Sequence, residues 1–340
     1  MRRLGLTLVW LLLSIADAQA CTYTRGLFLR MLDKWGQTCG HPLCGRIHRT
    51  GPPISPRGQP ECAGDPWMEL RDDIQSAVVD GGSVLIGEVH DNPLHHELRS
   101  RMALGTFASI VMEQIRADQF AGLDKIKEIV ERGFEPASMD GVLTALEWDK
   151  SGWSNYQYEP LIRAILLSRR PVYAGDPARD SIKSVAKDGS SALVEADVKR
   201  LKLDLPLGEK LEAAAAAELA TAHCQAGSDR SGLANMAVAQ RYRDAHMADA
   251  VAMAMEKHRS ALLFAGNEHV RSDRGVPWYL RQSAPGKKIT SVMLVEVEKD
   301  KVDVEDYVPK DPDGKPAADY IIFTPPAERS NPCTQGTENK

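Results

Sequence analysis

Short apolar runs alternate with stretches of helical spacing along the middle of the chain. The runs at 83–89 and 107–115 are each followed by a segment in which apolar residues return every three or four positions. A buried strand, a tight turn and an amphipathic helix in succession are typical of a βα unit. Further predicted strands lie at 170–176, 261–270, 289–297, 301–308 and 320–324. The pattern predicts an α/β fold with a largely parallel or mixed central sheet flanked by helices.

Helical segments separate the strands. A helix is predicted to begin at Pro93 with Asn92 as its N-cap. Between the third and fourth strands, the alanine-rich segment 211–224 and the segment 235–258 both favour helix. We therefore expect a smaller helical portion, inserted around 178–258.

The two ends of the chain differ from this middle part. Residues 1–20 combine two arginines, a short apolar run and a small-x-small ending, which predicts a signal peptide. Residues 21–66 are rich in Gly, Pro and Cys and are expected to form a lead-in outside the core. The main domain is expected over 67–325, followed by an irregular tail at 326–340. These features predict an exported protein, either periplasmic or associated with the outer membrane.

Six cysteines bear on export and on the lead-in. In an exported chain an even number permits three disulfides, which is the interpretation we favour, without a connectivity. A lipid anchor at Cys21, directly after the predicted cleavage site, is an alternative, but the residues before it make a poor lipobox. Cys39 and Cys44, with His41 and His48 nearby, suggest a metal site as another alternative, although their spacing fits no established zinc pattern.

Composition and charge restrict the class of partner. With 43% hydrophobic and 26% charged residues, the chain resembles an ordinary globular protein. Its formal net charge is −5 and no long basic stripe is present, so a nucleic-acid footprint and a polybasic membrane patch are both missing. No glycine-rich phosphate loop follows a strand, and Gly-x-Ser-x-Gly is absent. We expect a small molecule, a metal or a protein as partner, and no nucleic acid.

Polar residues stand at the ends of four predicted strands. The first and fourth runs both end in Gly-x-x-His, with Glu88 and His90 in one and Glu268 and His269 in the other. The second run ends in Glu113. The remaining polar residues at strand ends are Gln114, Asp176 and Asn267. Because ligands of open α/β sheets sit outside the carboxyl ends of the strands, we expect these groups to face one cleft.

The paired motifs carry more weight than either alone. A single histidine at a strand end is more often a hydrogen-bonded structural residue than a ligand. Two histidines with acids beside both favour a site, because imidazole with carboxylate suits a divalent metal or a base oriented by an acid. His95 and His96 are weaker candidates, because a solvated helix face explains them equally well.

Residues 147–161 are unusual because they gather Trp148, Trp153, Tyr156 and Tyr158 in an aromatic-poor chain. Either they form a satellite hydrophobic cluster under a loop, or they form a flat wall for a planar ligand with a tyrosine able to ligate ferric iron. Both interpretations stay open.

The segment 235–258 offers a further set. Arg243 and Asp244 either form a local ion pair or reach the acidic groups of a ligand. The residues with helical spacing, for which core packing is favoured over haem ligation, are His246, Met247, Met253 and Met255.

These motifs together resemble the ChaN family of haem-binding, iron-regulated proteins, within the Tiki and erythromycin-esterase-like superfamily. The matching pieces are LIGEVHDNPLHH, IVMEQ, WDKSGWSNYQYEPL, QRYRDAHMADAV and LLFAGNEHVRSDRGVPWYL. The paired Gly-x-x-His and the segment with Asp273, Gly275, Val276 and Pro277 make the resemblance specific. The lead-in contributes nothing to it.

The resemblance implies an α/β core with a smaller helical portion, export, and haem binding in haem and iron acquisition. It also implies a homodimer with haems stacked face to face, and an outer-membrane haem receptor as a further partner. Candidate haem ligands are Tyr156, Tyr158, His90 and His269, and Tyr173 is a further tyrosine that fits. Arg271 is a candidate for a bidentate contact with a propionate, or an ordinary surface charge.

The same resemblance implies a hydrolase as the alternative. Glu88, His90, Glu113 and His269 match the polar set shared by the superfamily, and would be the catalytic residues. In one version Glu88, His90 and His269 hold a divalent metal such as Mn or Zn, which activates water. In a metal-free version one histidine acts as base, oriented by a neighbouring carboxylate.

Overall fold

A mixed sheet of seven strands organises the protein, whose computed structural model describes residues 26–57, 62–105, 108–133, 135, 138–222 and 230–329. The strand order is β1-β7-β6-β2-β5-β3-β4. The strands are β1 (Ile47–Arg49), β2 (Ser83–Ile86), β3 (Ser109–Arg116), β4 (Val172–Asp176), β5 (Ala261–Phe264), β6 (Ile289–Glu296) and β7 (Tyr320–Thr324). β1 pairs antiparallel with β7, and every other pair is parallel. The predicted fold class is therefore confirmed.

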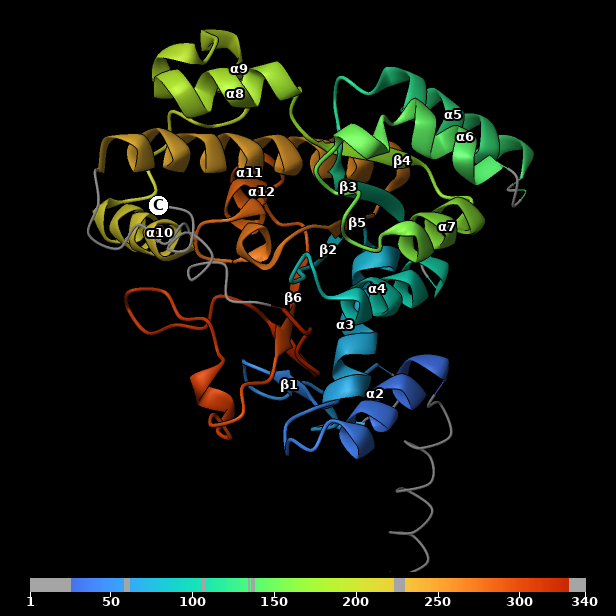
Figure 1. Ribbon diagram of the computed structural model, residues 1–340. Coiled ribbons are helices and arrows are strands. Elements are labelled where there is room, and N and C mark those ends of the chain that lie inside the picture. Colours follow the sequence, from blue (N-terminus) through green and yellow to red (C-terminus); the bar gives the residue numbers. More distant parts are fainter. Residues whose placement is uncertain are drawn as a thin grey trace, which may run out of the picture.

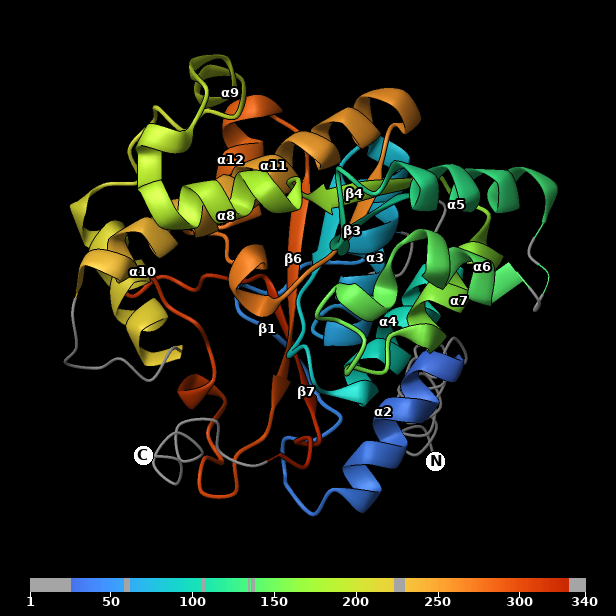
Figure 2. The same cartoon turned by 45° about the horizontal axis from the view of Figure 1, so that its top comes forward.

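Helices cover both faces of the sheet (Figure 1). One layer consists of α2 (Leu27–Thr38), α3 (Pro66–Asp80), α4 (Pro93–Gly105), α5 (Phe120–Arg132), α6 (Ser138–Ala145) and α7 (Glu159–Ser168). The other side carries α8 (Arg179–Asp188), α9 (Glu195–Arg200), α10 (Glu209–Ala222), α11 (Arg230–His258) and α12 (Val276–Ser283). Figure 2 shows α8 lying along α11. The 3-10 helices are η2 (Trp148–Lys150), η3 (Gly189–Ala192), η4 (Asn267–Val270) and η5 (Val304–Asp306).

Two hydrophobic cores follow from the alternation of side chains along each strand. In β2, Ile86 belongs to the core under α2 to α7, whereas Leu85 belongs to the core under α11 and α12. All four residues of β2 are buried, as expected for a parallel strand with helices on both faces. The cores hold the carboxyl ends of β2, β5, β3 and β4 side by side.

The predicted cap after β2 is present. The backbone N–H of Leu94 donates to Asn92 Oδ1 at 2.9 Å, and α4 begins at Pro93. The Asn92 amide also donates to Glu296 Oε1 at 2.7 Å and to the carbonyl of Pro325 at 3.0 Å. The loop that follows β2 is thereby tied to the ends of β6 and β7.

The lead-in differs from the expectation that it lies outside the core. Ile47 in β1 pairs with Ile322 in β7, so this segment completes one edge of the sheet. Leu32 and Trp35 of α2 are buried in the core. The composition misleads here because the Gly- and Pro-rich residues flank only three residues of strand.

Two of the predicted strands also differ. Residues 301–308 form no strand, because the Asp303 side chain accepts from the N–H of Glu305 and starts the 3-10 turn η5. β5 ends at Phe264, and the following Gly-x-x-His segment turns into η4, where His269 N–H donates to the Gly266 carbonyl at 3.1 Å.

The cysteine and export predictions are tested only in part. Cys39 and Cys44 are free thiols, so the three-disulfide prediction is wrong for this pair. The signal peptide, Cys21, Cys224 and Cys333 lie outside the described residues, and their roles stay predictions. Within the described residues, no helix is both long and apolar enough to span a membrane.

Candidate functional site

The carboxyl ends of four neighbouring strands bring most of the predicted polar residues together at one edge of the sheet. β2 and β5 lead into the two Gly-x-x-His segments, β3 and β4 carry one acid each, and α11 adds two charged residues. The charged and titratable residues gathered there are Glu88, His90, Glu113, Asp176, Arg243, Asp244 and His269.

Glu88 is the buried centre of the first half of this site. Its Oε1 accepts hydrogen bonds from the Tyr158 hydroxyl at 2.5 Å and from Gln114 Nε2 at 3.2 Å. The Nδ1 of His90 lies 3.1 Å from the same oxygen. The other oxygen, Oε2, forms an ion pair with Arg99. Both oxygens of this carboxylate are therefore engaged by the protein itself.

The Nδ1 atom of the His90 ring faces Glu88, whereas Nε2 lies on the other side of the ring. Because an ionised carboxylate only accepts, Nδ1 of His90 carries the proton that it shares with Glu88. Nε2 is then left with a lone pair, and its nearest carboxylate, Glu113, lies 4.0 Å away. Burial lowers the pKa of His90 although Glu113 opposes this. His90 is thus a neutral imidazole, and 34% of its side chain is exposed.

Gly266 gives His90 the space that it occupies. A Cβ at this position would lie 2.8 Å from Cε1 and Nε2 of His90, closer than real Cβ contacts. The glycine of the second motif is therefore needed for the histidine of the first.

Glu113 is the centre of the second half. It accepts from the backbone N–H of Gly266 at 2.7 Å, from Arg243 Nη2 at 2.7 Å and from His269 Nε2 at 3.2 Å. Burial alone would raise the pKa of Glu113, but His269, His90 and Arg243 together hold it well below its ordinary value. Arg243 also donates through Nε to Asp176 at 2.7 Å.

His269 lies between two carboxylates. Its Nδ1 is 2.6 Å from Asp244 Oδ1, and its Nε2 faces Glu113. Burial opposes the charged form, yet the two carboxylates raise the pKa of His269 to about 10. Both ring nitrogens therefore donate, and His269 is an imidazolium with only 4% of its side chain exposed.

The aromatic segment divides between core and surface. Trp148 and Tyr158 are buried, and Tyr158 stacks on His96 with ring centroids 4.0 Å apart. Trp153 and Tyr156 are half-buried; the Trp153 ring lies 4.9 Å from His90 and 6.3 Å from Tyr156. Trp148 and Tyr158 thus belong to the hydrophobic core, whereas a flat wall for a planar ligand stays a prediction for Trp153 and Tyr156. We call His90, Trp153 and Tyr156 the aromatic face.

The family described as haem-binding uptake, Tiki superfamily, ChaN matches residues 76–280. The chain belongs to this ChaN family. The match includes both Gly-x-x-His segments and the aromatic segment between them. It leaves out α2 and β1. No curated protein sequence matches the chain significantly.

One solved structure of a ChaN protein shares the fold of this chain. The structure titled cofacial heme binding to ChaN of Campylobacter jejuni superimposes with a TM-score of 0.50 at 19% identity. The match covers 74% of this chain and 91% of the Campylobacter chain. At this identity the similarity shows the fold alone. A structural-genomics protein from Bacillus cereus matches at 14% identity with a TM-score of 0.33, covering 87% of this chain and 97% of its own.

Several residues that the resemblance to ChaN suggests as haem contacts form other interactions in the structure. The Tyr158 hydroxyl donates to Glu88, and Tyr173 pairs with His258 Nε2 at 2.8 Å. Arg271 is buried and donates to both oxygens of Asp273, at 3.0 and 2.8 Å. Among the helical candidates, His246 Nδ1 lies 3.0 Å from the Gly175 carbonyl, Met247 and Met255 are buried, and Met253 is exposed.

The divalent-metal alternative is not supported. Among the described residues, no three His, Cys, Asp or Glu side chains are placed to hold one ion. The predicted trio does not converge, because Glu88 faces Arg99 and Tyr158, whereas His269 faces Glu113 and Asp244.

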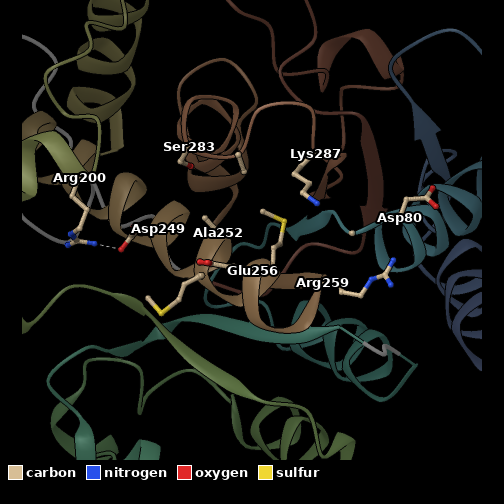
Figure 3. Close-up of a pocket in the computed structure, with 12 residues that line it drawn as sticks. Asp80, Arg200, Asp249, Ala252, Glu256, Arg259, Ser283 and Lys287 are labelled. Atoms are coloured by element: carbon tan, nitrogen blue, oxygen red, sulfur yellow. Dashed lines mark hydrogen bonds and ion pairs between the residues drawn. The ribbon is translucent and has the colours of Figure 1, made fainter.

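A cavity of about 950 Å³ lies at the other edge of the sheet (Figure 3). Gly81, Arg259 and Lys287, which precede β2, β5 and β6, help to line it, and the Arg200–Asp249 ion pair lies at its wall. None of its lining residues is a histidine, tyrosine or cysteine, the residues that most often ligate haem besides methionine. The carboxyl edge is therefore the better candidate site.

Sequence reasoning missed two contributors. Arg99 forms an ion pair with Glu88, and the side-chain amide of Gln240 lies beside the His269 ring, 3.1 Å from Nδ1. Arg99 stands in no quoted motif, and Gln240 is the first residue of QRYRDAHMADAV but was not singled out there. Both come from helices whose many charged and polar residues look alike in the sequence.

Proposed function

We propose that this protein binds haem against the aromatic face. Membership of the ChaN family of haem-binding uptake proteins supports the ligand. The observation that carries the placement is the pairing of half-buried Trp153 and Tyr156 beside a neutral histidine with a free ring nitrogen.

The residues present fit a haem in three respects. Trp153 and Tyr156 offer flat, partly exposed rings on which a porphyrin can lie. Within the described residues the Tyr156 hydroxyl has no hydrogen-bond partner, so its oxygen is available. His90 adds a neutral imidazole at the edge of the same face.

Tyr156 is the proposed iron ligand. Ferric haem iron accepts a phenolate oxygen as an axial ligand. Tyr158 is two residues away, but its hydroxyl is buried and donates to Glu88, and burial raises its pKa, which disfavours the phenolate. The structural reason for choosing between the two tyrosines is therefore exposure.

A homodimer follows from the openness of the aromatic face. A haem lying on an open face leaves its other surface in water, and a second copy of the chain would cover it. The Campylobacter relative, which binds heme cofacially, has the same fold. We expect hemin to convert monomer to dimer, which sedimentation velocity at fixed protein concentration would detect.

Export and a role in iron acquisition complete the proposal. The signal-peptide pattern of residues 1–20 supports periplasmic or outer-membrane-associated delivery, where an outer-membrane haem receptor is the expected partner. Fractionation of the native host with intact-mass measurement would show cleavage after Ala20, or a lipid at Cys21.

A metal-free hydrolase is the second candidate, and one observation favours it. Glu88 orients His90 as a carboxylate orients a general base, and the pKa of His90 is not raised. His269, held as an imidazolium, cannot serve as base at neutral pH. An ester hydrolysis that is lost in His90→Ala but not in Tyr156→Phe would support this candidate.

A hemin titration tests the haem proposal. We expect saturable binding of the purified protein by its Soret band, with a shifted band and about tenfold weaker affinity in Tyr156→Phe. Tyr173→Phe is the matched control, because Tyr173 pairs with His258 rather than with the aromatic face. Equal spectra for all three proteins would exclude Tyr156 as ligand, and a non-saturable titration would reject haem binding itself.

A further inference from the structure

Arg99 is a buried cation that the proposed function does not yet explain. It comes from α4, none of its side chain is exposed, and its guanidinium lies 4.8 Å from the centroid of the Phe264 ring. Burial lowers the pKa of Arg99 to about 10, which still leaves it charged at neutral pH. A charge so deep in the protein requires an anion, because an unpaired buried charge is strongly unfavourable.

Glu88 is that anion. Arg99 Nη1 forms an ion pair with Glu88 Oε2, and in the described part of the chain no nitrogen of Arg99 has a further hydrogen-bond partner. The carboxylate is thus divided: Oε2 faces the cation, and Oε1 faces Tyr158, Gln114 and His90.

His96 cannot take the place of Arg99. Its Nε2 lies 3.3 Å from Glu88 Oε2, but its Nδ1 faces the Gln157 carbonyl at 3.1 Å and carries the proton there. Burial lowers the pKa of His96 to about 4, so Nε2 has no proton to donate at neutral pH. Among the described residues, Arg99 is then the one permanent cation in contact with Glu88.

We propose that Arg99 is a positioning residue that keeps Glu88 anionic and thereby fixes His90 with its proton on Nδ1 and its lone pair on Nε2. The tautomer of a histidine is set by the hydrogen bond that its other nitrogen makes. This role of Arg99 rests on the proposed haem site in one respect, because it keeps Nε2 of His90 as an acceptor at the edge of the aromatic face. The tautomer itself is a property of the protein without haem.

Histidine nitrogen NMR on the haem-free protein tests the proposal. In the wild type, the His90 signals, assigned with His90→Ala, should show a protonated Nδ1 and an unprotonated Nε2. In Arg99→Met the proton should shift towards Nε2, the form that a free imidazole prefers. In Arg99→Met/Glu88→Gln the Nδ1 proton should return, because a neutral amide oxygen accepts it without needing a cation.

The results for these variants distinguish a role of Arg99 in positioning His90 from a role in folding. An unchanged His90 tautomer in folded Arg99→Met would overturn the proposal. If that variant does not fold, the double variant decides: a folded double variant with the Nδ1 proton supports the role, whereas failure of both would show that Arg99 acts through its packing on Phe264 and would refute it. Arg99→Lys, which keeps the charge, should keep the tautomer.

Hemin titration of the same variants distinguishes this proposal from the haem proposal. We expect about tenfold weaker binding in Arg99→Met, the size of effect that follows loss of a group orienting a ligand. If wild-type protein has the predicted tautomer but does not bind hemin, the haem proposal fails and the role of Arg99 stands. If it binds hemin with the proton on Nε2, the reverse holds.

Discussion

The two Gly-x-x-His histidines face the same carboxylate, Glu113, and yet have opposite properties. His90 is 34% exposed, lies 4.0 Å from Glu113 and has a lowered pKa. His269 is 4% exposed, is held by Glu113 and Asp244, and has a pKa raised to about 10. The two histidines share the Gly-x-x-His pattern, but the residues that surround them differ. Arg99 neutralises the carboxylate beside His90, whereas His269 is itself the cation that its two carboxylates require.

The largest effect should come from removing that cation. His269→Ala leaves Glu113 and Asp244 facing each other, buried and without His269 between them. We expect a loss of about 3–5 kcal/mol of unfolding free energy, measured by urea denaturation. His90→Ala is the control and should cost about 1 kcal/mol, the value of one hydrogen bond. Similar losses of unfolding free energy in the two variants would contradict the difference between His269 and His90.

The pH dependence of stability sharpens the same difference. The pKa of His269 rises from its ordinary 6.5 to about 10 on folding, so its stabilisation is complete below pH 6.5 and is lost as pH rises towards 10. We expect the unfolding free energy to fall by about 3–5 kcal/mol across that window. Urea titrations at several pH values should show the fall in wild type and in His90→Ala, but not in His269→Gln.

Gly266→Ala, a change in the second Gly-x-x-His motif, should disturb the histidine of the first motif. The new Cβ would meet the His90 ring at 2.8 Å, so the ring must move away from its position beside Glu113. We expect a stability loss of about 1–3 kcal/mol and a changed His90 NMR signal, with His269 unchanged. Gly232→Ala, in α11 with no atom near its Cβ, is the matched control and should stabilise by up to about 1 kcal/mol. An undisturbed His90 signal in Gly266→Ala would contradict the close approach.

The smallest effect should come from Trp153→Leu. This change removes a ring 4.9 Å from His90 and opens the aromatic face to water. Because burial is the main cause of the lowered pKa of His90, that pKa should move back up, while the titration of His269 stays as it was. NMR titration of the two histidines measures both at once, and a downward move of His90 would be inconsistent with burial as the cause.

The sequence predicts much of this arrangement, because the patterns that it contains are local. Apolar runs located β2, β3, β4, β5, β6 and β7, and the rule that parallel strands share a carboxyl edge brought Glu88, Glu113 and His269 to one end of the sheet. The start of α4 was predictable because Asn92 is a favoured N-cap residue and a proline follows it.

What the sequence could not predict depends on contacts between distant segments. Arg99 and Arg101 are two arginines of one helix, but the first is fully buried and the second pairs with Glu97 near the surface. No residue pattern separates them; only the position of Glu88 does. The opposite charge states of His90 and His269 likewise depend on Arg243 and Asp244, which α11 brings from a separate part of the chain.

The pairing of β1 with β7 has a consequence for how the protein folds. β1 has one neighbour in the sheet, and that neighbour is the last strand of the described chain. Ile47 therefore gains its backbone hydrogen-bond partners only when the segment around Ile322 is in place. A pairing between residues so far apart in the sequence forms slowly. An unpaired β1 leaves its backbone groups open to other chains in the meantime. β1 is thus among the last strands to become native, although it comes first among the strands in the described sequence, and its rate of pairing is limited by the formation of β7.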